Sequence, residues 1–302
     1  MLAETLELLL PAAQQSALPV FVDCTFGAGG HTKEILTRIR GSRVIVLDVD
    51  PNAVARAQAL ATEYPDRVTP IHANFAHLDE ALDSAGVREV NGIMYDLGLS
   101  SLQLADAARG FALHGQGELD MRLDPTSDAA TAAQLLATAK EGEIADIIFE
   151  FGDERYARRI ARQIVRRRER SPLRTTSDLV AAVLSAQPRS AHRRRGGIHP
   201  ATRTFLALRM AVNRDIDRLS SSLAQAVAHV IPGGRIVVIS FHSGEDRVVK
   251  HTFAAWRRAG IADVVTRKPM TPTQTEILGN PRSRSAKLRA VERTGTPLRR
   301  SA

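Results

Sequence analysis

The chain contains few of the residues that form disulfides, metal sites or membrane spans. Cys24 is its only cysteine, which excludes an internal disulfide and any zinc site made from several cysteines. No segment approaches the roughly 18 consecutive apolar residues of a membrane helix, and the first residues lack the basic start of an export signal. We therefore expect a protein of the reducing cytoplasm that has no membrane anchor and binds no metal.

Positively charged residues, by contrast, are in excess. The 302 residues include 41 Lys and Arg against 33 Asp and Glu, which gives a formal net charge of +8. Such a surface attracts polyanions, and arginine can bind phosphate or stack on a base. A run of positive charge is more often only a solvated face, so it indicates RNA contact weakly. The candidates are Arg158, Arg159 and Arg166 on a predicted amphipathic helix, and Arg193, Arg194 and Arg195 in a glycine-containing loop.

Strand-like and helix-like segments alternate along the chain. Short apolar strands are predicted at 20–23, 43–50, 67–72, 91–96 and 234–240, and helical patterns at 32–40, 51–63 and 77–84 separate the first four. Alternation with nearly continuous apolar strands is typical of a parallel sheet that helices cover on both faces. The sequence therefore predicts an α/β fold.

A long interruption separates the fourth strand from the fifth. Residues 97–233 are many more than a crossover connection needs, and a predicted helix within 201–234 already leads into the fifth strand. The segment before that helix has mostly helical patterns. We therefore predict an inserted helical domain at 106–198, and a sheet-bearing domain formed by 1–105 and 199–302.

The glycine-rich turn after the first strand predicts a site for a nucleoside-containing cofactor. In "VDCTFGAGGHTKEIL", Gly27, Gly29 and Gly30 permit a tight turn that brings backbone amides close to a ligand. Asp48, at the end of the second strand, can accept both hydroxyls of a ribose. NAD is one candidate, but the last glycine of G-x-G-x-x-G is missing, and Asp23 can accept from the amino group of S-adenosylmethionine. The pattern favours S-adenosylmethionine, and a turn that only packs a helix against a strand is the alternative.

Polar residues after the fourth and fifth strands are candidates for catalysis. "MYDLGLSSLQL" ends the fourth strand at Asp96 and continues to the hydroxyl of Ser100, and His242 follows the fifth strand in "ISFHSGED". An aspartate that caps the next turn, and a histidine with a structural hydrogen bond, are the alternatives. For an amine substrate the residue must accept an N–H hydrogen bond, which Asp120 and Asp124 can also do.

Several long segments resemble the ribosomal RNA small subunit methyltransferase H family, the bacterial cytosine N(4)-methyltransferases. They are "VDCTFGAGGHTKEIL", "YDLGLSSLQLADAARGFALHGQGELDMRLDP", "FGDERYARRIARQIV", "HPATRTFLALRMAVNRDID", "PGGRIVVISFHSGEDRVVK" and "NPRSRSAKLRAVER". The resemblance implies a Rossmann-like, class I S-adenosylmethionine methyltransferase sheet with an inserted helical domain. It also implies methylation of a cytidine amine in 16S ribosomal RNA, at the decoding centre of the small ribosomal subunit.

The resemblance further implies which residues bind the cofactor and which part faces the RNA. The inserted helical domain would face the RNA, and Phe75 would lie against the adenine, although a core phenylalanine is the commoner expectation after a third strand. The implied cofactor contacts are Gly29, Gly30, His31, Asp48, Phe75, Asp96 and Gln103.

The chain departs from the family's pattern at three places, one of which is the stretch from Gly260 to Lys268, shorter than in many members. Members usually have a His-x-Pro-Val-Leu segment before the helix that matches "ETLELLL", whereas this sequence starts at Met1 and Leu2. Gly244 stands where a leucine is usual after "FHS". A non-catalytic RNA-binding protein on the same fold is therefore the alternative to the enzyme, and the oligomeric state stays open, with a homodimer among the options.

Overall fold

The computed structural model describes residues 1–188 and 199–298, which form two compact units. One unit combines Met1–Gly98 with Ile216–Ala302, and the other is Leu99–Asp215. In the described ranges no helix has both the length and the apolar character needed to cross a membrane. The predicted RNA contacts Arg193, Arg194 and Arg195 lie outside the described residues.

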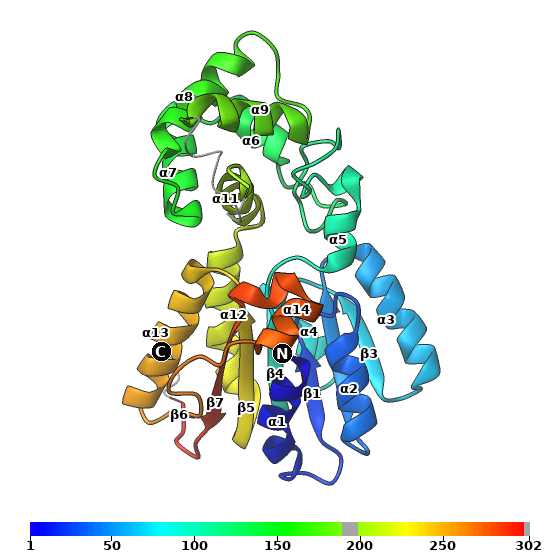
Figure 1. The fold of residues 1–302 in the computed structure, drawn as a ribbon. Coiled ribbons are helices and arrows are strands. Elements are labelled where there is room, and N and C mark those ends of the chain that lie inside the picture. The colour runs from blue at the N-terminus through cyan, green and yellow to red at the C-terminus, as the bar shows by residue number, and fades with distance from the viewer. Residues whose placement is uncertain (189–198, 299–302) are drawn as a thin grey trace. The chain divides into compact units, whose positions relative to one another are not determined.

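A seven-stranded sheet forms the centre of the first unit (Figure 1). Its strands are β1 (Val20–Asp23), β2 (Arg43–Asp48), β3 (Val68–His72), β4 (Val90–Asp96), β5 (Val230–Ser240), β6 (Ala262–Val264) and β7 (Lys287–Arg293). The order is β3-β2-β1-β4-β5-β7-β6. The first five strands in this order are parallel, and β7 is antiparallel to both of its neighbours.

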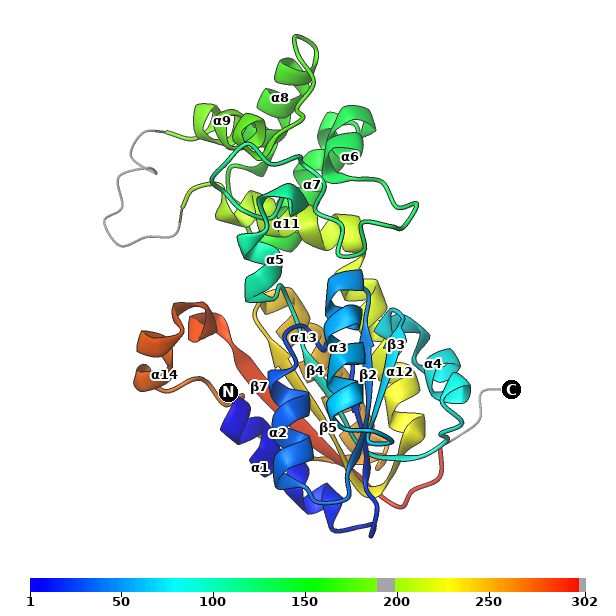
Figure 2. The same cartoon turned by 90° about the vertical axis from the view of Figure 1, so that its right-hand side faces the viewer.

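Helices cover both faces of this sheet, as Figure 2 shows. One face carries α1 (Leu2–Ala13), α2 (Gly30–Arg38) and α3 (Pro51–Glu63), and the other carries α4 (Leu78–Ser84), α12 (Asp215–His229) and α13 (Ser243–Arg258). A short helix, α14 (Gln274–Gly279), precedes β7. The two-sided cover explains why the parallel strands are apolar at nearly every position.

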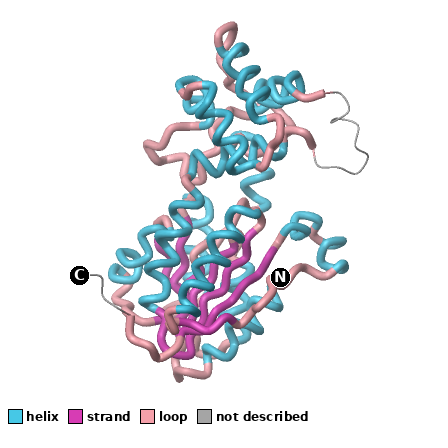
Figure 3. The backbone as a smooth tube through the Cα atoms, turned by 90° about the vertical axis from the view of Figure 1, so that its left-hand side faces the viewer, coloured by secondary structure: helices cyan, strands magenta, loops and turns pink. Residues whose placement is uncertain are grey.

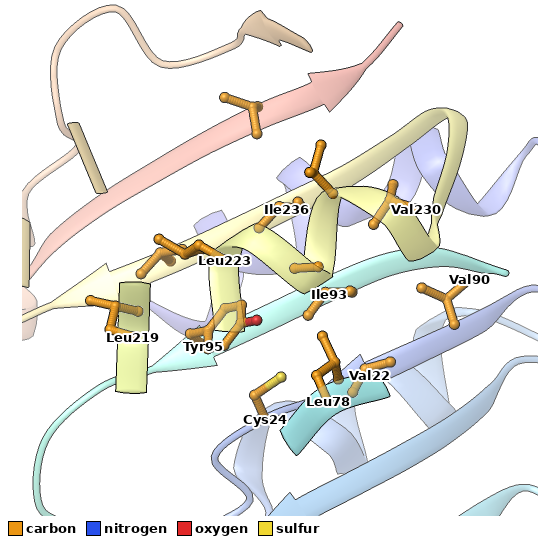
Figure 4. Packing of buried hydrophobic residues seen from close by; sticks show 14 of the residues in the cluster. Val22, Cys24, Leu78, Val90, Ile93, Tyr95, Leu219, Leu223, Val230 and Ile236 are labelled. Carbon is orange, nitrogen blue, oxygen red and sulfur yellow. The ribbon is translucent and has the colours of Figure 1, made fainter. Parts of the chain in front are cut away.

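Alternate residues of each strand pack into two separate cores. In β4, Met94 belongs to the core under α1, α2 and α3, whereas Ile93 and Tyr95 belong to the core under α4, α12 and α13 (Figure 4). In this second core the ring of Trp256 stacks on that of Phe253, with 5.5 Å between their centroids. Burial on both faces fixes the register, because a slip by one residue would exchange the two cores.

The strand order reverses between β1 and β4, which fixes where a ligand can bind. The chain passes from β1 outward to β2 and β3, and then returns to place β4 on the other side of β1. In open parallel sheets such a reversal leaves a crevice at the carboxyl ends of the two strands. Asp23 ends β1 and Asp96 ends β4, so both lie at this crevice.

The sequence predicted the five parallel strands, and the structure confirms them, but it did not predict β6 and β7. The segment that forms β7 carries the basic residues Lys287, Arg289 and Arg293, which interrupt its apolar pattern. Arg289 is nevertheless buried, and its Nε donates to Asp246 Oδ1 over 2.6 Å. Lys287 Nζ donates to Asp246 Oδ2 over 3.0 Å. Asp246 of α13 therefore neutralises both basic side chains, which allows this segment to form a buried strand although its sequence is charged.

The second unit consists of helices and connecting loops (Figure 3). Its helices are α5 (Ser101–Ala105), α6 (Ala132–Thr138), α7 (Glu141–Gly152), α8 (Ala157–Arg168), α9 (Thr176–Ala186) and α11 (Thr202–Asn213). They share one core, to which α7 contributes Ile144 and Ile148 and α8 contributes Ile160 and Ile164. The unit therefore has a hydrophobic interior of its own.

The boundaries of this helical unit differ from the predicted limits of 106–198. Phe205 and Leu208 of α11 pack into the core of the helical unit. Arg214 has φ +50°, a left-handed conformation that ends α11 before α12 begins. The sequence predicted one helix within 201–234 because its apolar pattern continues through this break. In the structure α11 belongs to the helical unit and most of α12 to the sheet unit.

A substitution at Gly117 tests how tightly the loops of the helical unit are packed. A Cβ at this position would lie 1.7 Å from the carbonyl oxygen of Ala107, whereas one at Gly142 would meet nothing within 4 Å. We expect Gly117→Ala to destabilise the unit by about 2 kcal/mol or more, because backbone must move. Gly142→Ala, the control, should leave the thermal midpoint unchanged or slightly higher, since alanine favours helix. Equal midpoints for both variants, measured by circular dichroism, would contradict the packing.

Candidate active site

The glycine turn after β1 has the backbone geometry that the sequence predicted. Gly27 has φ +54° and Gly29 has φ +81°, a region that favours glycine. A Cβ at Gly29 would also lie 2.6 Å from the ring of Phe26. At Gly30, the first residue of α2, an added Cβ would meet no atom within 4 Å. The backbone at the start of α2 is therefore open to a ligand.

Two side chains hold the peptide groups of Gly27 in place. Its N–H donates to Asp48 Oδ2 over 2.8 Å, and its carbonyl oxygen accepts from Nε and Nη2 of Arg56, each at 3.1 Å. The other oxygen of Asp48 accepts from the N–H of Asp50 over 2.9 Å. Each carboxylate oxygen keeps a further lone pair, so Asp48 can still accept from a ribose. Arg56 was not predicted, because nothing in α3 distinguishes it from a solvent-facing arginine.

Thr25 connects the ends of β1 and β4. Its N–H donates to Asp23 Oδ1 over 3.1 Å, and its hydroxyl oxygen accepts from the N–H of Asp96 over 2.7 Å. Asp23 Oδ2 accepts from the hydroxyl of Thr32 over 2.7 Å. The buried carboxylate of Asp23 is thereby held by hydrogen bonds within the protein, a role the sequence did not suggest for Thr25 or Thr32.

The carboxyl groups at this edge are harder to ionise than ordinary aspartates. Burial raises the pKa of Asp23 to about 6, and burial together with the charge of Asp23 raises the pKa of Asp96 to about 7. Burial also raises the pKa of Asp48. Glu245 adds its charge next to Asp96. The crevice thus gathers several carboxyl groups within a protein of net charge +8.

His31 and Asp96 face each other without forming an ion pair. Their Nδ1 and Oδ2 atoms lie 3.6 Å apart, and burial lowers the pKa of His31 to about 4, so its ring is neutral at pH 7. His31 Nε2 and Asp96 Oδ1 are buried and have no hydrogen-bond partner among the described residues. Because 33% of the Asp96 side chain remains exposed, a ligand can reach this carboxylate.

Phe75 lies just after β3, in a short 3-10 helix at Phe75–His77. It is partly buried, and its ring meets that of Tyr95 edge to face with 5.7 Å between the centroids. The hydroxyl of Tyr95 is in turn bonded to Ser222 over 2.7 Å. One part of Phe75 therefore belongs to the core and another is exposed, which is compatible with the predicted contact to a base.

His242 forms the N-cap of α13. Its Nδ1 accepts from the N–H of Gly244 over 3.0 Å, and its own N–H donates to Glu245 Oε2 over 3.1 Å. The N–H of Phe241 donates to the same Glu245 oxygen over 3.0 Å. Since Nδ1 accepts, the proton of the neutral ring is on Nε2. This arrangement gives His242 a structural task, and its catalytic role stays a prediction.

The remaining predicted site residues belong to the helical unit. Ser100 caps α5, where its N–H donates to Gln103 Oε1 and its hydroxyl accepts from the N–H of Gln103. Arg122 donates to the carboxylate of Asp120 through Nε and Nη2, each over 2.8 Å, and these two hydrogen bonds hold the pKa of Asp120 below its ordinary value. Asp124 accepts from the N–H of Thr126. The assigned roles of Ser100, Gln103, Asp120 and Asp124 stay predictions.

The predicted RNA contacts on α8 lie on its solvent side. Arg158, Arg159 and Arg166 are exposed, opposite the buried Ile160 and Ile164. In the described structure Arg158 and Arg166 have no ion pair, whereas two neighbouring arginines do. Those are Arg162, which lies 3.5 Å from Glu141, and Arg167, which lies 3.7 Å from Asp178.

The residues at the crevice fit S-adenosylmethionine. Asp23, Asp48, Asp96 and Glu245 bring negative charge to a place where the sulfonium and ammonium groups of that cofactor would bring positive charge. The open backbone at Gly30 leaves room for it. No group of three or more His, Cys, Asp or Glu residues that could hold a metal occurs in the part of the chain that the structure describes.

The sheet, its glycine turn and its acidic strand ends define an S-adenosylmethionine-dependent methyltransferase. A model of the MraW methylase family matches residues 1–294, and the chain belongs to this family.

Relatives of this protein carry the name "Ribosomal RNA small subunit methyltransferase H". The one from Synechococcus elongatus is 48% identical over 273 residues, which cover 90% of this chain and 88% of the relative. That from Thermomicrobium roseum is 47% identical over 289 residues, with 90% and 87% covered. The crystal structure of the N-methyltransferase NodS from Bradyrhizobium japonicum with S-adenosyl-l-homocysteine is 10% identical, with a TM-score of 0.41 and 96% and 86% covered. A similarity this remote carries no argument.

The raised pKa of Asp96 predicts a pH-dependent difference in stability between the wild type and Asp96→Asn. Between the unfolded pKa of 3.8 and the folded pKa of about 7, the folded state keeps a proton that the unfolded state releases. Stability therefore falls as pH rises through this window, and the full penalty is present above it. The amide has no such penalty, so we expect the thermal midpoint of Asp96→Asn to gain on the wild type from pH 5 to pH 8.

The exposed Asp128 provides a control for this experiment. Asp128→Asn should follow the wild type at both pH values. A gap between Asp96→Asn and the wild type that stays constant, or narrows as pH rises, would show that Asp96 ionises as easily as an exposed carboxyl.

Proposed function

We propose that this protein transfers a methyl group from S-adenosylmethionine to the N(4) amine of a cytidine in 16S ribosomal RNA, at the decoding centre of the small ribosomal subunit. The relatives at 47 and 48% identity, over nine-tenths of the chain, carry the proposal for the substrate. The choice of cytidine N(4) and of the decoding centre rests on the resemblance of the quoted segments to the family. We place the reaction in the cytoplasm, where small subunits occur.

The charge of the crevice favours S-adenosylmethionine over a dinucleotide. Asp23 and Asp96 lie at the ends of adjacent strands beside the glycine turn, and Asp48 occupies the N–H of Gly27. These carboxylates would repel a pyrophosphate, and the N–H of Gly27 could not donate to it because Asp48 already accepts that hydrogen bond. A cationic ligand would instead be attracted, which argues against NAD as the cofactor.

The protein's own residues would bind and orient both reactants. S-adenosylmethionine supplies an electrophilic methyl group on a sulfonium. Asp48 would accept from the ribose, and Asp23 or Asp96 would accept from the ammonium group. Arg56 and Asp48 hold the peptide groups of Gly27, and Thr25 holds the ends of β1 and β4 together. The site is therefore largely ordered before the reactants bind.

Asp96 is the residue we propose to meet the amine of cytosine. This amine is a poor nucleophile because its lone pair is delocalised into the ring, so alignment matters and its N–H groups need an acceptor. One third of the Asp96 side chain is exposed although its Oδ1 is buried, so an N–H group can reach this carboxylate from solvent. Its pKa of about 7 also suits a group that takes up a proton near neutral pH.

A methyl-transfer assay tests this function directly. Wild-type protein with labelled S-adenosylmethionine and small subunits from a strain lacking the modification should yield one N(4)-methylated cytidine at the decoding centre, mapped by mass spectrometry. Asp48→Ala should weaken cofactor binding on the order of 10- to 100-fold, since it removes hydrogen bonds to a charged group.

Asp263→Ala, at an exposed position of β6 on the far edge of the sheet, serves as the control and should bind the cofactor normally. Unchanged affinity in Asp48→Ala would remove the ribose assignment. Subunit binding without any methyl transfer by the wild type would instead support a non-catalytic RNA-binding protein.

The exposed arginines of α8 should contribute to RNA affinity through phosphate contacts. We expect the triple variant Arg158→Gln/Arg159→Gln/Arg166→Gln to bind small subunits more weakly. The magnitude of the negative slope of log affinity against log salt should decrease by about 2, at roughly 0.7 per phosphate contact on single-stranded RNA. Arg162→Gln/Arg167→Gln, from the same helix, should change the slope less, because acidic residues already pair with these two arginines. A triple variant with the wild-type slope would leave α8 as a solvated face.

A further inference from the structure

Residues 271–286, which include α14, leave the sheet and return to it beside the active site; we call this segment the excursion. The pairing register connects Asp96 of β4 to Ile239 of β5, and Ile239 to Leu288 of β7. Leu288 in turn exchanges two backbone hydrogen bonds with Met270, each at 2.9 Å. The chain therefore leaves the sheet after Met270 and re-enters it at Lys287, beside the residues that are in register with Asp96.

The excursion is close enough to Asp96 for one RNA strand to touch both. Two inter-strand spacings separate Asp96 from Leu288, which is about 10 Å. Lys287 pairs with Ser240, the last residue of β5, so the residues before Lys287 lie beyond the carboxyl ends of the parallel strands. Figures 1 and 2 show α14 beyond that end of β7. This is the same edge of the sheet at which Asp96 lies.

A fixed turn in this excursion presents two arginines to solvent. Ser283 is buried, and both its N–H and its hydroxyl donate to the carbonyl oxygen of Asn280, at 3.0 and 2.8 Å. The N–H of Ala286 donates to the carbonyl oxygen of Ser283 over 2.8 Å. Arg282 and Arg284, on either side of the anchored serine, are exposed. The turn is thus held by its backbone and by Ser283, and the guanidinium groups are not needed to hold it.

These two arginines differ from the basic residues that follow them. Lys287 and Arg289 are neutralised by Asp246. Arg282 and Arg284 have no ion pair in the described parts of the chain, and Glu276, the one acid of the excursion, contacts the N-terminal ammonium of Met1. Two unneutralised positive charges therefore lie beside a crevice that is itself acidic.

We propose that Arg282 and Arg284 bind phosphates of the RNA strand that flanks the target nucleotide. This inference rests on the proposed function, because a nucleotide whose base reaches Asp96 must bring its flanking phosphates over this edge of the sheet. Phosphate contacts position a nucleic acid without reading its sequence. The two arginines would then hold the strand while the acidic crevice receives the cofactor and the base.

The test compares Arg282→Gln/Arg284→Gln with a control of equal charge change. Arg40→Gln/Arg88→Gln serves as the control, since both residues are exposed and precede β2 and β4, at the opposite end of the parallel strands. Small subunits that lack the methyl group are the RNA probe. We expect the magnitude of the negative slope of log affinity against log salt to decrease by about 1.4 in the first variant, at roughly 0.7 per contact, and to stay unchanged in the control.

Kinetics and cofactor binding complete the test. The double variant should show a raised KM for subunits, with kcat and the affinity for S-adenosylmethionine as in the wild type. An unchanged slope, or an equal fall in the control, would overturn the inference while leaving the proposed function intact, provided that the wild type still transfers the methyl group. A wild type that transfers none would remove the proposed function, and with it this inference.

Discussion

The hydrogen bonds of Thr25 at the reversal of the strand order are the contact on which the site depends. Thr25 is the point at which the first parallel strand meets the fourth, and through it the backbone of Asp96 and the side chain of Asp23 are held together. The residues between these strands in sequence include β2 and β3, which form one edge of the sheet. The hydrogen bond from Asp96 to Thr25 joins residues that are 71 positions apart, so it can form only once the chain between them is folded.

Charge is distributed in opposite ways over this molecule. The surface carries an excess of arginine, which suits a polyanion. The crevice gathers carboxyl groups, whose burial makes them reluctant to ionise. An acidic centre within a basic surface allows one protein to attract RNA and a cationic cofactor without the two competing for the same groups. The cost is that the acids must be held close together, which explains why backbone amides and threonine hydroxyls surround them.

Much of the fold could be predicted from the sequence, because the signals are local. The apolar runs of the parallel strands, the positive-φ glycines and the aspartates at strand ends each occupy a few consecutive residues. Thr25 and Arg56 could not be found in this way, because their roles depend on Asp96 and Gly27, which are distant in the chain. The break at Arg214 was missed for a related reason, since a left-handed residue leaves an apolar pattern uninterrupted.

The stacked pair of Trp256 and Phe253 has a practical consequence for studying the two units. Trp256 is the only tryptophan of the chain and lies in the core under α13, so its fluorescence reports on the sheet-bearing unit alone. The helical unit contributes helix signal but no tryptophan emission. Because helices of both units contribute to far-ultraviolet dichroism, a dichroism transition that does not coincide with the fluorescence transition would show that the two units unfold separately, without any introduced label.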